Sequence, residues 1–297
     1  MTRILVFGKN GQLATALADV ASGTEFDLEF IGSYEFNLIE QASDIYNYIT
    51  NFMSIDAVIN ASAYTDVDKA EMQGAKDAWI LNTLAPEQMA KACKVRGIPF
   101  FHVSTDSVFN GNKSAAYRPD DAVDPVNFYG LTKLEGERLV RSVGGHNIIF
   151  RTSWVFSKTG HNFVNAMLAL ARKHTHIKVV DDQTGLPIYA PDLAQALLHA
   201  AGKIISNPAQ ATDPVYHIAG GGQSINRYEF AKLIMRTAGL KTQVEPISSA
   251  EFDAPAPRPK NAVLDTRSFT STFGAGIPDW KIGLREMLSK GGNINGQ

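Results

Sequence analysis

The sequence predicts an α/β fold in which a doubly wound parallel sheet is followed by a smaller, intertwined C-terminal lobe. In the first half, short apolar runs alternate with longer stretches whose apolar residues recur at helical spacing. A glycine-containing turn, Gly8 to Gly11, joins the first apolar run to the first helical stretch. Alternation of this kind, with connections long enough for crossover helices, predicts a Rossmann-type sheet that binds ligands at the carboxyl ends of its strands.

The expected elements of the first half follow this alternation. Five short apolar runs are typical of buried parallel strands, at residues 3–7, 27–31, 55–60, 98–103 and 147–151. The stretches between them show helical periodicity, at residues 12–20, 40–52, 75–96 and 128–142. We therefore expect a dinucleotide-binding domain over residues 1–152.

The second half has a looser pattern, which indicates a smaller lobe. Helices are expected at residues 161–173, 191–205, 227–238 and 280–289, and short strands near 177–180 and 214–218. Pro255, Pro257 and Pro259 mark an irregular stretch. Residues 153–297 are thus predicted to form mainly a substrate-binding lobe, with some segments returning to the first domain.

Composition and charge argue against several classes of protein. The chain has 297 residues, 44% hydrophobic and 20% charged, and its 28 basic and 30 acidic residues leave a net charge of -2. Nucleic-acid binding would require a basic surface. No apolar run reaches the roughly 18–20 residues of a membrane span, and the apolar start is shorter than a signal peptide requires. A cytoplasmic enzyme that acts on a small molecule is the class that remains.

Cysteine and histidine usage argues against a disulfide framework or a metal centre. Cys93 is the single cysteine of the sequence and is expected to be a buried helical thiol. The 7 histidines show no spacing typical of zinc ligands. No metal site is predicted.

The glycine loop after the first strand is the candidate dinucleotide site. Gly8 allows the chain to turn sharply, and Gly11 leaves the first turn of the following helix open to a pyrophosphate. Backbone N–H groups at a helix N-terminus have no partner within the helix and favour an anion. Ala14 occupies the third small position, so the spacing is GxxGxxA. Such a turn also occurs without a ligand, but its place after the first strand favours a dinucleotide.

The residues after the second strand bear on the choice between NAD and NADP. An acidic residue there binds the ribose 2′-hydroxyl, whereas a basic one accommodates a 2′-phosphate. The strand ends in Ile31-Gly32-Ser33, which are neither acidic nor basic. These small residues leave room for a phosphate, so NADPH is expected, with NADH as an alternative. Glu35 is the residue that would bind a 2′-hydroxyl.

A tyrosine and a lysine four residues apart are the candidate proton donor and its cation. Tyr129 and Lys133 share one face of a predicted helix, and a cation is expected to lower the tyrosine pKa from about 10. Tyr228 and Lys232 have the same spacing, so spacing alone does not choose between the pairs. Tyr129 follows the strand that ends in Ser104-Thr105, whose hydroxyl groups suit a substrate carbonyl. The first pair is therefore preferred, and the second is interpreted as ordinary helix residues.

Motifs along almost the whole chain together resemble the extended short-chain dehydrogenase/reductase family. They are Gly8-Lys9-Asn10-Gly11-Gln12-Leu13, Asn60-Ala61-Ser62-Ala63-Tyr64-Thr65, Val67-Asp68-Lys69-Ala70-Glu71, Ser104-Thr105-Asp106, Tyr129-Gly130 with Lys133, Arg151-Thr152-Ser153-Trp154-Val155-Phe156, Asp182-Gln183, Tyr216-His217, Arg258-Pro259 and Leu264-Asp265-Thr266. The resemblance is closest to members that act on dTDP-linked sugars. It implies reduction by NADPH of the 4-keto group of dTDP-4-dehydro-6-deoxy-L-mannose, giving dTDP-L-rhamnose.

The same resemblance implies roles for individual residues. Thr105, Tyr129 and Lys133 would form the catalytic set. Tyr129 and Lys133 would also contact the cofactor, together with residues that follow the first four strands, namely Gly8, Gly11, Gln12, Leu13, Asn37, Leu38, Ala61, Ser62, Ala63 and Val103. The sugar nucleotide would contact Thr105, Asp106 and Trp154.

The chain departs from the family at a few positions. Ser107 stands where the family often has tyrosine, and Ala14 where it often has glycine. Some relatives bind Mg²⁺ between carboxylates at a dimer interface, but residues 188–191 lack the acid that such a site needs. Mg²⁺ is therefore not supported by the sequence, and a homodimer stays open.

Two substrate-binding candidates have competing interpretations. Arg258, in the proline-rich stretch, is either a ligand of the diphosphate or a solvated surface arginine. Trp154 is either a platform for the sugar ring or a core tryptophan. The function has alternatives as well, namely a reductase or epimerase of another nucleotide 4-keto sugar and a non-enzymatic regulatory relative. The intact Thr105, Tyr129 and Lys133 argue against the last of these.

Overall fold

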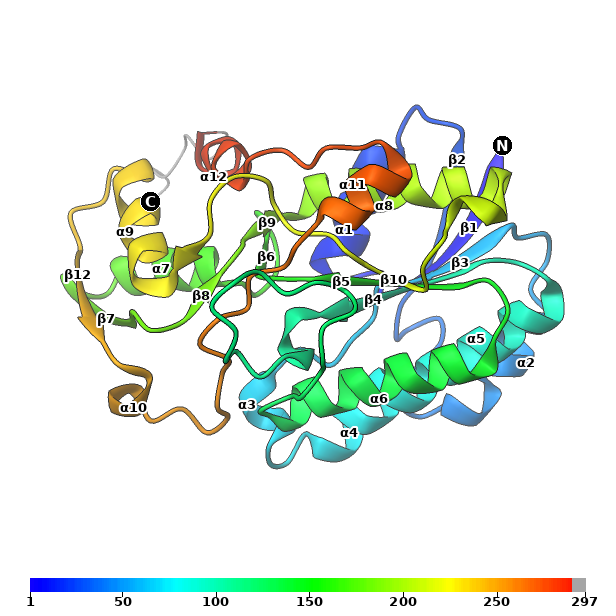
Figure 1. The fold of residues 1–297 in the computed structure, drawn as a ribbon, viewed down its shortest axis with the longest axis horizontal. Helices are drawn as coiled ribbons and strands as arrows, with labels where there is room; N and C mark the ends of the chain where they lie inside the picture. Colours follow the sequence, from blue (N-terminus) through cyan, green and yellow to red (C-terminus); the bar gives the residue numbers. More distant parts are fainter. Residues whose placement is uncertain (290–297) are drawn as a thin grey trace.

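A six-stranded parallel sheet forms the centre of the computed structural model, which describes residues 1–289 (Figure 1). Five strands come from the first half and confirm the predicted apolar runs, with ends displaced by at most two residues. They are β1 (Thr2–Phe7), β2 (Phe26–Ile31), β3 (Ala57–Asn60), β4 (Phe100–Thr105) and β5 (Asn147–Thr152). The order β10-β5-β4-β3-β1-β2 places β1 between β2 and β3, where successive connections pass to opposite faces. A doubly wound sheet is therefore confirmed.

The sixth strand comes from the second half of the chain. β10 (Val215–His217) lies within the run predicted at residues 214–218 and pairs in parallel with β5, with Val215 opposite Ile149. A segment of the second half thus completes the sheet of the first half. The division between two domains near residue 152 stays a prediction.

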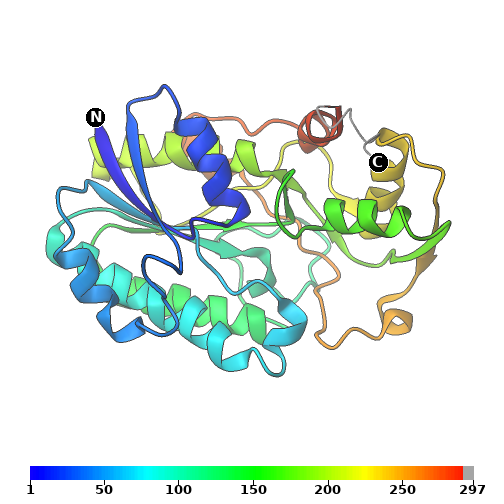
Figure 2. The same ribbon diagram turned by 180° about the vertical axis from the view of Figure 1, so that it is seen from behind.

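Helices cover both faces of the sheet, as Figures 1 and 2 show from opposite sides. One face carries α1 (Gln12–Ala21), α8 (Ala190–Ser206) and α11 (Arg267–Phe273), whose apolar residues form one core with β1, β3 and β5. The other face carries α2 (Ile45–Thr50), α5 (Ala85–Arg96) and α6 (Phe128–Val143). Cys93 is fully buried on α5, as expected.

The predicted helix at residues 75–96 is interrupted by a π-helical turn. α4 (Ala75–Trp79) leads into this turn, η2 (Ile80–Leu84), and α5 follows without a break. At η2, α6 comes so close that a Cβ atom on Gly136 would lie 2.1 Å from the Asn82 carbonyl oxygen. The buried Asn82 amide also donates to the Tyr64 carbonyl oxygen at 3.1 Å and to Thr132 Oγ1 at 3.0 Å. These contacts hold α6 against η2.

The predicted helix at residues 40–52 is shorter than expected. A 3-10 turn, η1 (Ala42–Asp44), leads into α2, which ends at Thr50. Asn37 Oδ1 accepts the backbone N–H of Ile39 at 3.0 Å, and this contact holds the preceding segment in a turn instead of a helix.

The remaining elements form a lobe beside the sheet (Figures 1 and 2). Its predicted helices are present as α7 (Phe163–Ala171), α9 (Arg227–Thr237) and α12 (Trp280–Ser289), which share a core containing Phe230 and Trp280. The predicted strand near 177–180 is β7 (His176–Val180), which pairs in parallel with β12 (Gln243–Ile247). Short pairs join β6 (Val155–Phe156) to β9 (Ile188–Tyr189) and β8 (Thr184–Gly185) to β11 (Ile225–Asn226).

Several elements were not expected from the sequence. They are β6, β8, β9, β11, β12, α11, α3 (Val67–Ala70), α10 (Ser249–Phe252), η3 (Asp106–Val108) and η4 (Pro208–Gln210). Most are too short to show a periodicity of their own. The proline-rich stretch at residues 255–259 is irregular, as predicted. In residues 1–289, none of the helices combines the length and the apolar character that a membrane crossing requires.

Gly136→Ala is expected to destabilise the protein by about 1–3 kcal/mol, because the added methyl group meets backbone of η2 that cannot yield without displacing Asn82. Urea unfolding followed by circular dichroism measures this change. Gly276→Ala is the matched control, since a Cβ at Gly276 meets open space. Equal unfolding free energies for the two variants would contradict the role of this contact.

Candidate active site

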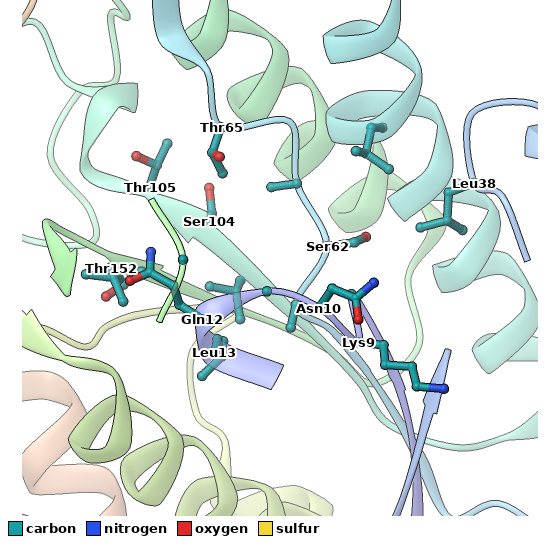
Figure 3. A pocket seen from close by; sticks show the side chains of 18 of the residues that line it. Lys9, Asn10, Gln12, Leu13, Leu38, Ser62, Thr65, Ser104, Thr105 and Thr152 are labelled. Carbon is teal, nitrogen blue, oxygen red and sulfur yellow. The ribbon is translucent and has the colours of Figure 1, made fainter. Parts of the chain in front are cut away.

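A cavity of about 610 Å³ lies at the carboxyl ends of the central strands. With the exception of Arg258, all of the predicted site residues line it, namely Gly8, Gly11, Gln12, Leu13, Asn37, Leu38, Ala61, Ser62, Ala63, Val103, Thr105, Asp106, Tyr129, Lys133 and Trp154. Figure 3 shows that the labelled side chains run from Thr65, Ser104 and Thr105 at one end to Lys9 and Leu38 at the other. The structure therefore brings together residues that are far apart in the sequence.

The glycine loop forms a cradle that an extra methyl group would fill. Gly8 has φ +104°, and a Cβ there would lie 2.8 Å from the Ala61 carbonyl carbon and the Ser62 nitrogen. Glycine alone satisfies both the positive φ and this close approach. Gly11 precedes the first turn of α1 without any side-chain cap, so the N–H groups of that turn remain available to an anion. Ala14 is buried against the sheet, as its small size predicts.

The Gln12 side chain connects the glycine loop to the second half of the chain. Its Oε1 accepts from Ser157 Oγ at 2.8 Å and from Asn162 Nδ2 at 2.9 Å, and its Nε2 donates to the His161 carbonyl oxygen at 3.2 Å. The segment 157–162 thereby lies beside the loop, and Gly160 and His161 join the cavity wall. Gln12 contributes its backbone N–H to the helix terminus, while its side chain holds the two segments together.

A lysine and a glutamate flank the end of the cavity near β2. Lys9 Nζ forms an ion pair with Glu35 Oε1, and Glu35 Oε2 accepts the N–H of Gly32 at 3.0 Å. The lysine beside Glu35 lowers the pKa of that carboxyl from its ordinary value. Lys9 lines the cavity together with Gly32 and Ser33. Sequence reasoning missed this cation because it stands in the glycine loop and not at the end of the second strand.

Lys133 is buried at the other end of the cavity. It is 1% exposed, and its Nζ donates to the Val103 carbonyl oxygen at 2.7 Å. Burial lowers the pKa of Lys133 to about 8, and the nearby charge of Glu137 acts in the opposite direction. This lysine therefore sits near its midpoint of protonation under mildly basic conditions.

Tyr129 lies beside the Thr105 hydroxyl in the same corner. Burial raises the pKa of Tyr129 to about 12, a hydrogen bond with Thr105 opposes the shift, and the charge of Asp106 adds to it. The expectation that a neighbouring cation lowers the tyrosine pKa is thus wrong, because burial of the phenol is the largest effect and raises its pKa. The phenol keeps its proton at neutral pH, as a proton donor must.

Asp106 follows Thr105 and is buried with it. Its Oδ1 accepts from Thr105 Oγ1 at 3.0 Å and from Ser107 Oγ at 3.3 Å. Burial raises the pKa of Asp106 to about 6, although these hydrogen bonds and the charge of Arg227 oppose the shift. Ser104 instead donates to Glu137, whereas Thr105 forms the hydrogen bond with the Tyr129 phenol.

The second tyrosine–lysine pair lies outside the cavity wall. Lys232 is exposed on α9 and forms an ion pair with Glu229 Oε1 at 3.0 Å. Lys232 Nζ lies 4.8 Å from the centre of the Tyr228 ring, and the interpretation of this pair as ordinary helix residues stays a prediction.

Trp154 and Arg258 have surroundings that the sequence did not reveal. Trp154 is half-buried with φ +43°, a left-handed backbone conformation that is unusual for a bulky residue. The Arg227 guanidinium carbon lies 3.5 Å from the centre of the Trp154 ring. Arg258 binds the Asp68 carboxylate through Nη1 at 2.6 Å and Nη2 at 2.9 Å. Neither alternative foresaw this ion pair, and a contact of Arg258 with the diphosphate stays a prediction.

Metal binding finds no support in the described part of the chain. Residues 1–289 contain no group of three or more histidine, cysteine, aspartate or glutamate side chains placed to hold an ion. That the protein works without Mg²⁺ stays a prediction from the sequence.

The chain is similar to known proteins over nearly its whole length. The family described as RmlD substrate binding domain matches residues 1–292. A dTDP-4-dehydrorhamnose reductase of Sinorhizobium fredii is 35% identical over 290 residues, which cover 96% of each chain. A crystal structure of a dTDP-4-dehydrorhamnose reductase from Clostridium acetobutylicum has a TM-score of 0.88 at 31% identity, covering 97% of this chain and 99% of that one. A Bacillus anthracis enzyme of the same name, solved in complex with NADP, has a TM-score of 0.88 at 30% identity, covering 98% and 100%.

Asp106→Asn is expected to stabilise the protein at high pH. The pKa of Asp106 is about 6 in the folded state, whereas its ordinary value is 3.8. The unfolding free energy therefore falls as the pH rises from about 4 to about 6, and it stays lower above pH 6. The amide should therefore raise the unfolding free energy by about 1–3 kcal/mol at pH 8 and by little at pH 4. Urea unfolding at both pH values measures the difference.

Asp120→Asn serves as the control, because Asp120 is largely exposed and its removal should change stability by about 0.5 kcal/mol or less at either pH. A gain in stability for Asp106→Asn that is the same at pH 4 and pH 8 would show that ionisation of Asp106 is not its cause.

Proposed function

The chain belongs to the RmlD substrate binding domain family, and we propose that its Thr105, Tyr129 and Lys133 carry out the reduction of dTDP-4-dehydrorhamnose to dTDP-L-rhamnose by NADPH. The observation that carries the proposal is the placement of these residues at one end of a cavity that also contains a dinucleotide cradle. A protonated phenol then lies where a carbonyl oxygen would receive its proton.

The cofactor fits the residues that are present. The positive φ of Gly8 and the uncapped first turn of α1 provide space and N–H donors for a pyrophosphate. Asn37 and Leu38 line the end of the cavity where the adenine is proposed to bind, and Ala61, Ser62, Ala63 and Val103 line its middle. Bound NADPH supplies the hydride for the reduction.

Tyr129 is proposed to donate the proton that the substrate oxygen takes up. Its pKa of about 12 keeps it protonated until negative charge develops on that oxygen. Thr105 shares a hydrogen bond with the phenol and orients it toward the substrate. The pKa of about 8 keeps Lys133 mostly protonated at neutral pH, so it is proposed to supply positive charge to the end of the cavity where proton transfer leaves a phenolate.

The sugar nucleotide is proposed to bind at the same end of the cavity. Thr105 and Asp106 present hydroxyl and carboxyl oxygens to the sugar hydroxyls, and Trp154 bounds the space beside them. The cofactor site is thus proposed to lie on the first half of the chain, and the substrate site on residues of both halves.

We place the reaction in the cytoplasm, since nicotinamide cofactors and nucleotide sugars are charged molecules of that compartment.

The decisive experiment supplies the ketosugar, made in situ from dTDP-glucose by a dehydratase and an epimerase, and follows NADPH absorbance. Oxidation of NADPH that depends on this ketosugar, with dTDP-L-rhamnose as the product, is the expected result. Turnover of a different nucleotide ketosugar alone would overturn the substrate and leave the reductase. Turnover without added reductant and with tightly held NAD would instead identify an epimerase.

Tyr129→Phe is expected to lower kcat by about 10²–10⁴-fold, because the variant lacks the proton that acid catalysis requires. Steady-state kinetics with the ketosugar measures this loss. Tyr228→Phe is the matched control and should stay near the wild-type kcat. The opposite pattern would show that the other tyrosine–lysine pair is the catalytic one.

The cofactor preference is expected to depend on the ion pair of Lys9 and Glu35. The wild-type enzyme should use NADPH with a kcat/KM at least equal to that for NADH. Glu35→Gln removes a negative charge beside the proposed 2′-phosphate and frees Lys9, so it should raise the NADPH-to-NADH ratio of kcat/KM by about threefold to tenfold. An unchanged ratio would place the 2′-phosphate away from this pair.

A further inference from the structure

Arg227 differs from the other arginines that the structure withdraws from solvent. Among the arginines of residues 1–289 that are not exposed, Arg3 and Arg258 bind carboxylates, Arg96 binds two carbonyl oxygens, and Arg151 binds both oxygens of Glu137. The guanidinium of Arg227 donates to no group in the described part of the chain, and its nitrogens are not sealed from solvent. Five N–H donors are thus held half-buried without an acceptor.

Aromatic rings hold this guanidinium in place. Its central carbon lies 3.5 Å from the centre of the Trp154 ring and 4.7 Å from that of Phe163. Trp154 is itself packed so closely on Gly185 that a Cβ there would lie 2.4 Å from the indole. Stacking fixes the plane of a guanidinium and leaves its N–H edge free for acceptors in that plane. Arg227 is therefore oriented in advance of any ligand.

Arg227 lies beside the cavity, because the Trp154 ring on which it stacks is part of the cavity wall. Burial lowers the pKa of Arg227 to about 9, the carboxylate of Asp106 acts against that shift, and Arg258 adds to it. Asp106 and Trp154 both line the cavity, whereas the cradle for the cofactor pyrophosphate lies at the first turn of α1. Arg258 is already paired with Asp68 and Lys133 Nζ donates to the Val103 carbonyl oxygen, whereas the guanidinium of Arg227 has no hydrogen-bond acceptor within residues 1–289.

We propose that Arg227 binds the diphosphate of the nucleotide-sugar substrate through the N–H edge that Trp154 and Phe163 leave free. The proposal rests on the proposed function, which requires a doubly charged linker to enter a protein with no basic surplus. A planar fork of donors matches the oxygens of a diphosphate. The guanidinium then covers one face of the Trp154 indole. This face holds Arg227 in position for the diphosphate and is not available to stack against the sugar ring.

The test compares a ligand that has the diphosphate with one that lacks it. Calorimetry on the enzyme saturated with NADP⁺ gives the Kd of dTDP and of thymidine for the wild type, Arg227→Met and Arg227→Lys. Methionine keeps apolar bulk over the indole without the charge, and lysine keeps the charge without the planar fork. Lys232→Met, which removes an exposed cation from the same helix, is the matched control.

The expected result is a Kd for dTDP raised about 10-fold or more in Arg227→Met, and by a smaller factor in Arg227→Lys. Thymidine and NADPH affinities should stay within about twofold, and Lys232→Met should match the wild type. With the ketosugar, Arg227→Met should raise KM and leave kcat nearly unchanged, because the diphosphate is remote from the reacting carbon.

Two results would overturn the proposal. The first is an unchanged affinity of Arg227→Met for dTDP, which includes the case that the wild type binds no dTDP. The second is an equal loss of dTDP and thymidine affinity, which would make Arg227 a structural cover for Trp154. A wild type that binds dTDP through Arg227 but fails to reduce the ketosugar would overturn the proposed function and support the assignment of Arg227.

Discussion

The buried polar face of α6 determines where the candidate site lies. Tyr129, Lys133 and Glu137 follow one another at intervals of four residues and face the sheet. Lys133 and Glu137 are 1% and 2% exposed, and the sheet supplies a partner for each, the Val103 carbonyl oxygen at 2.7 Å and Arg151 Nη2 at 2.6 Å. Buried charges are costly unless they are paired, so these contacts permit one axial position of the helix. Tyr129 lies one turn earlier on the same helix, so the pairing of Lys133 and Glu137 also fixes the position of Tyr129 at the cavity.

The same helix is also held at its N-terminus by segments that are distant in the sequence. Asn127 caps α6 by accepting the Gly130 N–H at 2.7 Å, and it donates to the Pro257 carbonyl oxygen at 2.8 Å. Glu71 accepts the Phe128 N–H at 2.7 Å. The ion pair of Arg258 with Asp68 joins the proline-rich stretch to the same region. The irregular segment thus holds the N-terminus of α6 in place.

The two halves of the chain depend on each other at the site. Strand β10 completes the sheet, and the segment 157–162 is tied to Gln12 at the glycine loop. Trp154, Gly160 and His161 of the second half line the cavity, and Arg227 stacks on the Trp154 ring. These contacts hold the two halves together in the absence of a substrate. A substrate that contacts both halves would therefore bind a preformed surface.

The sequence by itself determined the parallel sheet, the glycine cradle and the preference for Tyr129 over Tyr228, because these depend on local periodicity and on residues that follow strand ends. The family resemblance named further residues that follow strand ends, and these line the cavity because a parallel sheet brings the carboxyl ends of its strands together. Gly160, His161 and Leu193 line it as well and were not named. The ion pair of Lys9 with Glu35, the pairing of Arg258 with Asp68, the stacking of Arg227 on Trp154 and the raised pKa of Tyr129 were decided by the tertiary structure. They depend on which charges become neighbours and how much water is excluded, and neither quantity is contained in the spacing of residues along one chain.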